Sequence, residues 1–362
     1  MQGCNHAERW PGGLIETMKR GFQVLLGLTL LAALAEGLVL IRIRIDPWRT
    51  AALLESMALL VGAFVGLAQP AFVKQLRRWA MASPVLAGGL PFLLLVPYLI
   101  FALGTRTFSL TALGKLVAYI LVPTALLLPD RLHHRASLTW RDGLAMLALA
   151  VPVAAGWLQG IWTWPQDIYV FRPIFCVLVG GYAFMVLRTL EGVGFRLVWR
   201  KSDVSDALMN LLAFALVAIP IGIALNFIHP HSNAQLMHGP IFQVPWLENI
   251  VGGLGPAVNF FFLFIGIYLT VAIPEELLFR GILQNLLVRT IQKGPRGLYG
   301  LLIASVLFGA AHLHHAPVPN WRYAILATLA GIFYGNVYRT RQRLCASALT
   351  HALVDTIWHF WF

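Results

Sequence analysis

Residues 257–281 read AVNFFFLFIGIYLTVAIPEELLFRG, a long apolar run that ends in two acids and, four residues after the second acid, an arginine. An apolar run of this length predicts a membrane helix, because about 20 such residues cross the hydrocarbon core. Within a bilayer an ionised side chain costs about 2.5–3.5 kcal/mol on insertion scales. Glu275, Glu276 and Arg280 therefore indicate a functional site in the membrane rather than a solvated surface.

The composition of the whole chain agrees with a membrane protein. Its 362 residues are 59% hydrophobic and 12% charged, with a mean hydropathy of +0.74. Soluble domains carry about 25% charged residues. Backbone groups in lipid must be satisfied internally, which favours helices, and the alternating pattern of an outer-membrane barrel is absent. The sequence predicts an all-α, polytopic transmembrane bundle of roughly 10–12 spans in the cell (inner) membrane.

The apolar segments suggest two regions of different character. Residues 1–200 form an N-terminal multi-span region without a recognisable motif, and residues 201–362 form a second domain with a motif core at about 245–362. The expected apolar segments are 22–41, 51–72, 84–104, 108–128, 143–162, 169–187, 207–228, 248–272, 298–313, 322–338 and 344–361, with an amphipathic segment at 275–290.

The net charge of +12 comes from short basic clusters between the apolar segments. Loops near 74–78, 130–142, 188–206 and 289–297 are basic, whereas 162–168 and 229–247 contain no Lys or Arg. This alternation predicts that the basic loops face the cytoplasm. No basic face is interleaved with exposed aromatic residues, so nucleic-acid binding is not expected. The lipid bilayer is the expected partner.

The spacing of the first motif separates two roles. Pro274 suits the first turn of a helix, and acids directly after a helix start interact favourably with its dipole. Glu276 and Arg280 are four residues apart, which predicts an ion pair on one helix face. Glu275 points about 100° away from Glu276 and is left available for chemistry. The alternative is that all three residues form a buried structural network.

Two further polar pairs follow at helical spacing. His312 lies four residues after Phe308, and Asp355 lies four residues after His351. Glu275 could act as a general base toward water, with His312 holding or sharing that water. His351 could donate to a developing oxyanion, while Asp355 orients it or completes a metal site. The alternative is a satisfied interfacial histidine and a buried pair that holds the last helix.

Other catalytic signatures are missing from the sequence. There is no H-E-x-x-H zinc motif, no G-x-S-x-G nucleophile elbow and no Walker-type phosphate loop. The three cysteines, Cys4, Cys176 and Cys345, form no C-x-x-C pair, so neither a disulfide framework nor a zinc–cysteine site is expected.

The three motifs together resemble a known family. The sequence reads Glu275-Glu276-x-x-x-Arg280, then Phe308-x-x-x-His312, then His351-x-x-x-Asp355. In this order, and within apolar segments, the motifs resemble the CPBP family, the CAAX-prenyl-protease and bacteriocin-processing proteins that are also called the Abi family. The resemblance covers roughly residues 245–362.

The resemblance implies an intramembrane endopeptidase that acts on a peptide or protein substrate at the membrane. By this resemblance Glu275 and His312 activate a water molecule. His351 and the residue at position 355 stabilise the oxyanion, and Glu276, Arg280 and Phe308 support the site.

Position 355 departs from the common family pattern. Asp355 stands where many members have asparagine, which can donate a hydrogen bond to an oxyanion, whereas an ionised aspartate cannot. Asp355 is therefore expected either to be protonated or to orient His351. A metallo-type alternative would place a divalent metal such as zinc on Glu275, His312 and His351. The glutamate type, without a cofactor, is preferred.

Two other functions compete with the peptidase. One is a non-catalytic immunity or scaffold protein of the same fold. The other is a proton-coupled transporter, which would need polar residues continuing across the bilayer and commonly has internal repeats; the N-terminal spans offer few polar residues, and no fixed-period repeat is visible.

The expected topology contains one conflict. If Glu275 lies at the cytoplasmic end of one span, a full crossing at 298–313 would carry His312 to the opposite end. The segment 275–290 is therefore expected to re-enter or cross the bilayer, which would leave the basic cluster Arg339–Arg343 difficult to place.

Overall fold

The structure is a computed structural model that describes residues 46–133, 135–165, 167–229, 256–291 and 297–362. Within these ranges the regular structure is helical and contains no strand. The all-α class predicted from the sequence is confirmed. The expected apolar segment 22–41 and most of the 229–247 loop lie outside the described residues.

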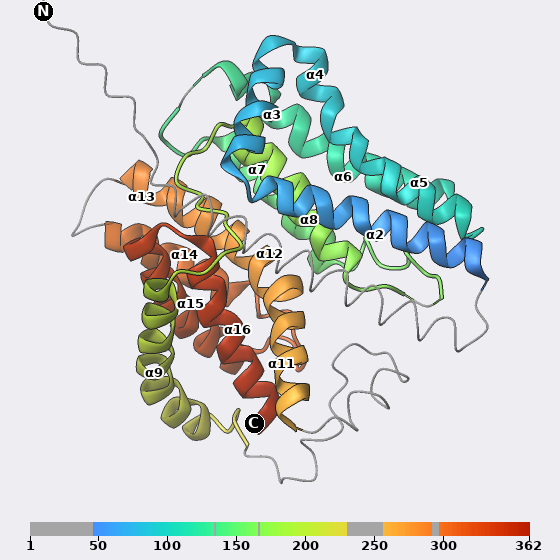
Figure 1. Cartoon of the computed structure of the whole chain (residues 1–362). Coiled ribbons are helices and arrows are strands. Elements are labelled where there is room, and N and C mark those ends of the chain that lie inside the picture. The colour runs from blue at the N-terminus through green and yellow to red at the C-terminus, as the bar shows by residue number, and fades with distance from the viewer. Residues whose placement is uncertain (1–45, 134, 166, 230–255, 292–296) are drawn as a thin grey trace, which may run out of the picture.

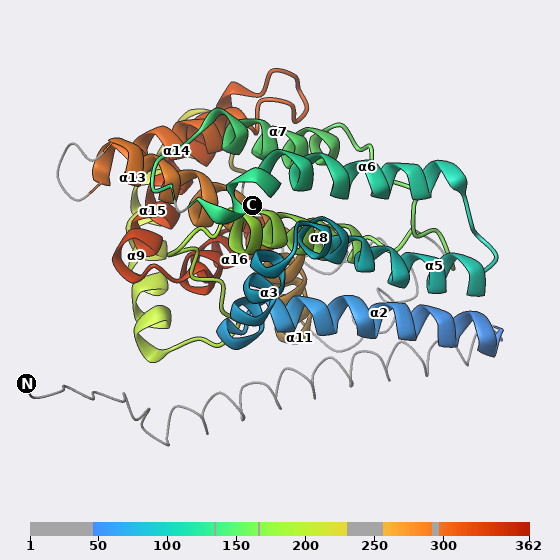
Figure 2. The ribbon, with the colours of Figure 1, turned by 90° about the horizontal axis from the view of Figure 1, so that it is seen from above.

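The first group of helices lies in the described part of the chain between residues 47 and 187. It consists of α2 (Pro47–Leu67), α3 (Pro70–Ala82), α4 (Pro84–Gly89), the 3₁₀ helix η1 (Leu90–Leu94), α5 (Leu95–Gly104), α6 (Leu110–Leu127), the 3₁₀ helix η2 (Leu128–Leu132), α7 (Trp140–Ala154), α8 (Phe171–Gly181) and the π-helix η3 (Tyr182–Leu187). Proline begins α2, α3 and α4, where its missing N–H would have no partner in the helix. Helices α2, α5 and α6 extend to one side of the molecule (Figure 2).

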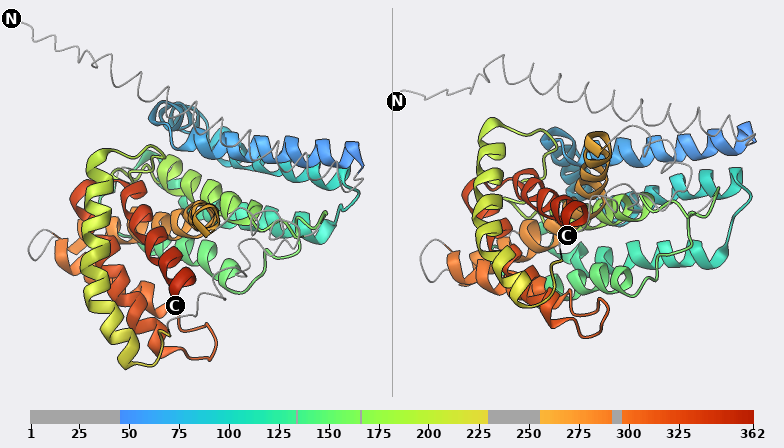
Figure 3. Two further views of the ribbon diagram at one scale, coloured as in Figure 1. Left: turned by 60° about the horizontal axis from the view of Figure 1, so that its bottom comes forward. Right: turned by 90° about the horizontal axis from the view of Figure 1, so that it is seen from below.

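The second group carries the three motifs. It consists of α9 (Lys201–Ala224), α11 (Pro256–Ile267), the π-helix η6 (Tyr268–Ala272), α12 (Ile273–Glu276), the π-helix η7 (Leu277–Gln284), α13 (Asn285–Ile291), α14 (Leu298–Ala310), α15 (Trp321–Arg341) and α16 (Leu344–Trp361). The two groups lie side by side, with α8 against α12 (Figure 1). Helix α16 lies between α9 and α11 (Figure 3).

Five helices in the described part are long and apolar enough to cross a membrane. They are Pro47–Leu67, Pro84–Gly104, Leu110–Leu132, Lys201–Ala224 and Asn259–Ile291. Two apolar helices, Phe171–Leu187 and Leu298–Ala310, are shorter. The chain is a multi-pass membrane protein.

The motif helix differs from the sequence expectation. The predicted segments 248–272 and 275–290 are not separate, because Asn259–Ile291 is one helical run of 33 residues. Pro274 therefore lies inside a helix, and the predicted helix start beside the acids is wrong. The π-helical turns η6 and η7 flank α12, and a wide turn accommodates a proline ring that would clash with the carbonyl four residues earlier in an α-helix.

This continuous helix removes the conflict in depth between Glu275 and His312. Glu275 lies near the middle of the run Asn259–Ile291. Helix α14 has 13 residues, about 20 Å at 1.5 Å per residue, which is shorter than a hydrocarbon core of about 30 Å. It runs back along the motif helix, and the ring of Phe308 packs on that of Phe279 at 5.0 Å between centroids. His312 thus returns to the level of Glu275, and of the two expected alternatives for 275–290 the structure has no separate re-entrant segment, because these residues continue the helical run that begins at Asn259.

Helices α14 and α15 pack closely because small residues face each other. Gly331 on α15 approaches Ser305 on α14, so that a Cβ added to Gly331 would lie 3.1 Å from the Cα atom of Ser305. A Cβ on Gly309 would meet the backbone carbonyl of Ala324 at 2.5 Å. Glycine at these positions therefore lets the two backbones approach, as is common between membrane helices.

The basic loops assigned to one side of the membrane lie together. Arg77 donates from Nε to the carbonyl oxygen of Met185 at 2.6 Å. Arg289 on α13 donates to the carbonyl oxygen of Glu191 at 2.9 Å. Arg343, in the cluster that was difficult to place, donates to Asp203 at 2.8 Å. The 339–343 cluster therefore joins the 188–206 segment at the same end as the other basic loops.

Candidate active site

The three motifs meet around one buried carboxylate, Glu276. The side chain of Glu276 is fully buried, and its Oε2 lies 3.2 Å from Nε of Arg280. The ion pair predicted from their spacing is present. The guanidinium carbon of Arg280 lies 4.2 Å from the ring centroid of Phe308, a cation–π contact that joins the first motif to the second.

His351 joins the third motif to the same carboxylate. Its Nδ1 lies 3.0 Å from Oε1 of Glu276. An ionised carboxylate only accepts hydrogen bonds, so Nδ1 is the donor. The opposite nitrogen, Nε2, lies 3.4 Å from Oδ2 of Asp355 and 3.9 Å from Oε2 of Glu275. His351 therefore presents one edge to a fixed acid and the other edge to two acids that are partly exposed.

Glu275 takes no part in the Glu276–Arg280 pair. Its side chain is 34% exposed, and its Oε2 is nevertheless buried and has no hydrogen-bond partner. A buried carboxylate oxygen that makes no hydrogen bond is unusual in proteins. Glu275 is thus the acid of this site that has capacity to bind a water or substrate proton.

The ring of His312 is oriented by a hydrogen bond to the backbone of the preceding helical turn. Its Nδ1 lies 2.8 Å from the carbonyl oxygen of Phe308. A carbonyl oxygen only accepts, so Nδ1 carries the proton and Nε2 of the neutral ring is an acceptor. The ring packs against those of Phe308 and Tyr323, each at 4.7 Å between centroids. No hydrogen bond or ion pair joins His312 to Glu275 in the described residues, so cooperation between them requires a bridging molecule.

The loop after α14 covers His312. The ring of His315 stacks on that of His312 at 5.7 Å with an interplanar angle of 23°. Burial lowers the pKa of His315, and the neighbouring His314 and His312 act in the same direction. The lowered pKa favours the neutral form of His315 beside the neutral ring of His312.

Two residues outside the motifs complete the cluster, and the sequence analysis missed both. Ser347 hydrogen-bonds to Oε2 of Glu276. Its position one helical turn before His351 places it on the same face of α16, so the spacing contained this signal. Tyr334 stacks on His351 with 4.6 Å between ring centroids and 17° between planes. No pattern in the sequence of α15 points to Tyr334.

The described residues contain no group of three or more His, Cys, Asp or Glu side chains placed to hold a metal ion. Zinc needs its nitrogen and oxygen ligands at about 2.0–2.2 Å. In the trio Glu275, His312 and His351, Nε2 of His351 lies 3.9 Å from Oε2 of Glu275, and no hydrogen bond or ion pair joins His312 to either residue in the described part of the chain. The three residues do not fit a metal site as arranged.

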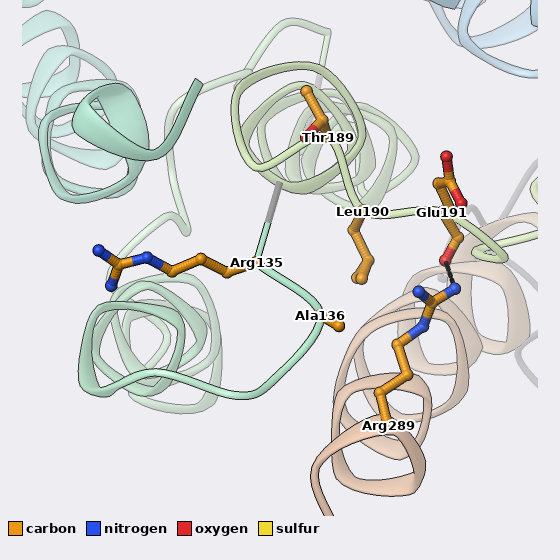
Figure 4. A pocket seen from close by; sticks show the side chains of 6 residues that line it. All are labelled: Arg135, Ala136, Thr189, Leu190, Glu191 and Arg289. Atoms are coloured by element: carbon orange, nitrogen blue, oxygen red, sulfur yellow. Dashed lines mark hydrogen bonds between the residues drawn. The ribbon is translucent and has the colours of Figure 1, made fainter. Parts of the chain in front are cut away.

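A separate pocket of about 220 Å³ lies at the basic end of the molecule (Figure 4). It is lined by Arg135, Ala136, Thr189, Leu190, Glu191 and Arg289. None of these residues belongs to the motif cluster, and Arg289 is already bonded to the backbone of Glu191. The motif cluster, rather than this pocket, is the candidate active site.

Comparison with known proteins supports the family resemblance. Residues 257–357 match a family model described as type II CAAX prenyl endopeptidase Rce1-like. The match includes all three motifs and confirms the predicted resemblance to CAAX-type proteases for this part of the chain. No curated protein and no solved structure matches the chain.

Proposed function

We propose that this chain, CAAX-protease-like over residues 257–357, is a glutamate-type intramembrane endopeptidase. It would hydrolyse a peptide bond in a membrane-associated or exported protein or peptide. The protein would be located in the inner cell membrane. The observation that carries the proposal is the contrast between two neighbouring acids: Glu276 is buried in an ion pair, and Glu275 has a carboxylate oxygen without a partner.

In the proposed reaction Glu275 is the general base. Its free oxygen accepts a proton from water, while Nε2 of His312 accepts the second hydrogen bond of that water and orients it. The water oxygen forms a bond to the carbonyl carbon of the peptide. The tetrahedral intermediate then breaks at its C–N bond, and the proton held by Glu275 passes to the leaving amine.

His351 is the proposed donor to the oxyanion. With Nδ1 donating to Glu276 at 3.0 Å, a protonated ring has Nε2–H available on the side of Glu275. A donor already in place stabilises the developing charge without reorganisation. Asp355, whose Oδ2 lies 3.4 Å from Nε2, would accept the hydrogen bond of this Nε2–H until the substrate oxygen takes its place. This assigns Asp355 an orienting role, because an ionised carboxylate cannot donate to an oxyanion.

The test is cleavage by the purified protein in reconstituted membranes. Cleavage by the wild-type protein would be compared with cleavage by Glu275→Gln and His312→Ala, each with and without a chelator. Substrates would be identified by comparing the membrane proteomes of cells that express the wild-type protein or one of these variants. The proposal expects cleavage to be lost in both variants and unaffected by the chelator. Equal cleavage by wild type and well-folded Glu275→Gln would overturn the assignment of Glu275 as the base, and absence of cleavage by well-folded wild type would favour the immunity or scaffold function. Loss of cleavage on chelation would replace the glutamate type by the metallo type.

A further inference from the structure

We propose that Tyr334 is a positioning residue for His351, an inference that rests on the proposed function of the site. Tyr334 lies in α15, outside the three motifs, and is 1% exposed. Its ring contacts one residue of each motif: Arg280 with 5.5 Å from the guanidinium carbon, Phe308 at 6.2 Å and His351 at 4.6 Å between ring centroids. It is therefore placed where the three motif helices converge.

The stacking fixes the plane of the imidazole. Tyr334 covers one face of His351 with an interplanar angle of 17°. Phe308 meets the same ring edge-on, at 5.8 Å and 88°. The last torsion of a histidine side chain has broad minima, so the plane of the ring is set by what packs on it. Between these two rings His351 holds Nδ1 toward Glu276 and Nε2 toward Glu275 and Asp355.

The backbone of Tyr334 lies beside a residue that contacts Glu276, the partner of His351. Its carbonyl oxygen lies 2.8 Å from Oγ of Ser347, and the same hydroxyl group lies against Oε2 of Glu276. The Ser347 hydroxyl has a single proton to donate, and both of these oxygens are acceptors that share it. Tyr334 thus contacts His351 through its ring, and its carbonyl oxygen lies beside the serine that hydrogen-bonds to Glu276.

The aromatic ring, and not the phenol, is expected to position His351. No hydrogen bond to the phenol oxygen of Tyr334 is present among the described residues, so Tyr334→Phe keeps the relevant contacts. Tyr334→Leu removes the flat face, which allows His351 to tilt. A displacement of about 1 Å at a reacting group can reduce a rate by about 100-fold. We expect kcat to fall about 10- to 100-fold in Tyr334→Leu and to stay within about twofold of wild type in Tyr334→Phe.

The matched control is Tyr338→Leu. Tyr338 is a buried tyrosine one turn further along α15, and its hydroxyl donates to the carbonyl oxygen of Gly192, away from the motif cluster. A purely structural effect of losing a buried tyrosine would appear in both leucine variants. A positioning effect would lower kcat only in Tyr334→Leu, with KM unchanged.

The deciding measurement is the ¹⁵N NMR spectrum of the His351 side chain, assigned with His351→Gln and recorded without substrate. Wild type and Tyr334→Phe should show the ring with Nδ1 protonated and bonded, and Tyr334→Leu should show averaged nitrogen signals. Unchanged His351 signals in Tyr334→Leu, or equal losses of kcat in the two leucine variants, would overturn the inference. Tyr334→Met takes the place of Tyr334→Leu if the latter does not insert. Because this spectrum needs no cleavage, failure of the proposed peptidase function is distinguished from failure of this inference.

Discussion

Two buried arginine–carboxylate pairs of this molecule have the same burial and very different surroundings. Arg188–Asp142, at the basic end, and Arg280–Glu276, in the motif cluster, are both essentially inaccessible. Arg188 lies 2.7 Å from Asp142 and also donates to the carbonyl oxygens of Arg135 and Ser137 at 2.8 and 3.0 Å. Its pair is saturated with hydrogen bonds.

The pair in the motif cluster is not saturated. Nη1 of Arg280 is buried without a hydrogen-bond partner, and Nη2 reaches the carbonyl oxygen of Gly331 only at 3.5 Å. The neighbouring Glu275 also has an oxygen without a partner. Buried polar groups are nearly always hydrogen-bonded, so each exception calls for an explanation such as a catalytic role or a bound water. The two pairs are therefore equally buried and differ in how many of their polar atoms have a hydrogen-bond partner.

Apart from the loss of cleavage expected in Glu275→Gln, the largest effect is expected for His312, which lies in the motif cluster with the unsaturated pair. His312→Ala removes the acceptor that orients the water, and general acid–base groups contribute about 10²- to 10⁴-fold to a rate. We expect kcat to fall at least about 100-fold with little change in melting temperature. The measurement is cleavage in proteoliposomes together with a thermal unfolding curve. A loss of cleavage that follows a loss of folded protein would contradict the assignment.

A second pair of variants tests whether the two ion pairs contribute differently to stability and to cleavage. Arg188→Met leaves Asp142 buried without its partner, and breaking such a pair costs about 3–5 kcal/mol. Arg280→Met removes fewer hydrogen bonds, so we expect a smaller loss of stability and a larger loss of cleavage. Chemical denaturation in detergent and the cleavage assay would be run on both variants. Equal stability losses, with equal residual activity, would remove the distinction between the two pairs.

A smaller effect is expected at the position that departs from the family pattern. In Asp355→Asn the amide oxygen can still accept from Nε2 of His351, whose distance to Asp355 is now 3.4 Å. If Asp355 only orients His351, this exchange should change kcat by no more than about threefold, since net hydrogen-bond differences are about 0.5–1.5 kcal/mol. Steady-state kinetics decide this, with Asp355→Ala as the control that removes the acceptor. A loss as large as that of His312→Ala would instead give Asp355 a direct part in the chemistry.

The smallest expected effect concerns a metal. The glutamate type predicts that prolonged dialysis against a chelator leaves cleavage unchanged, and that metal analysis of the active protein finds no stoichiometric zinc. Activity that is lost on chelation and restored by zinc would show that Glu275, His312 and His351 rearrange around an ion.

The local part of the site could be predicted from the sequence. Residues four apart on a helix are neighbours, so the spacing was enough to pair Glu276 with Arg280 and to place His351 beside Asp355. The approach of His351 to Glu276 joins residues 75 positions apart, and no spacing rule contains it. Tyr334 was missed for the same reason, since its role depends on how α15 packs.

The shape of the motif helix was also predicted wrongly from the sequence. Pro274 was interpreted as a helix start, because proline usually breaks an α-helix. The π-helical turns on either side of α12 accommodate it instead, and the apolar composition gives no sign of them. The length of α14 also led to a wrong prediction. When α14 was assumed to cross the whole membrane, His312 was expected at the opposite end from Glu275. The 13 residues of α14 instead return His312 to the same level as Glu275.

If the two adjacent acids have different tasks, Glu275→Gln and Glu276→Gln will differ in what they lose. Single-turnover cleavage and thermal unfolding would be measured for both variants in the same membranes. We expect Glu275→Gln to abolish cleavage and keep the unfolding temperature, whereas Glu276→Gln lowers the unfolding temperature because it weakens the bonds to Arg280, Ser347 and His351. Cleavage at the wild-type rate by Glu275→Gln would show that Glu275 is not the general base.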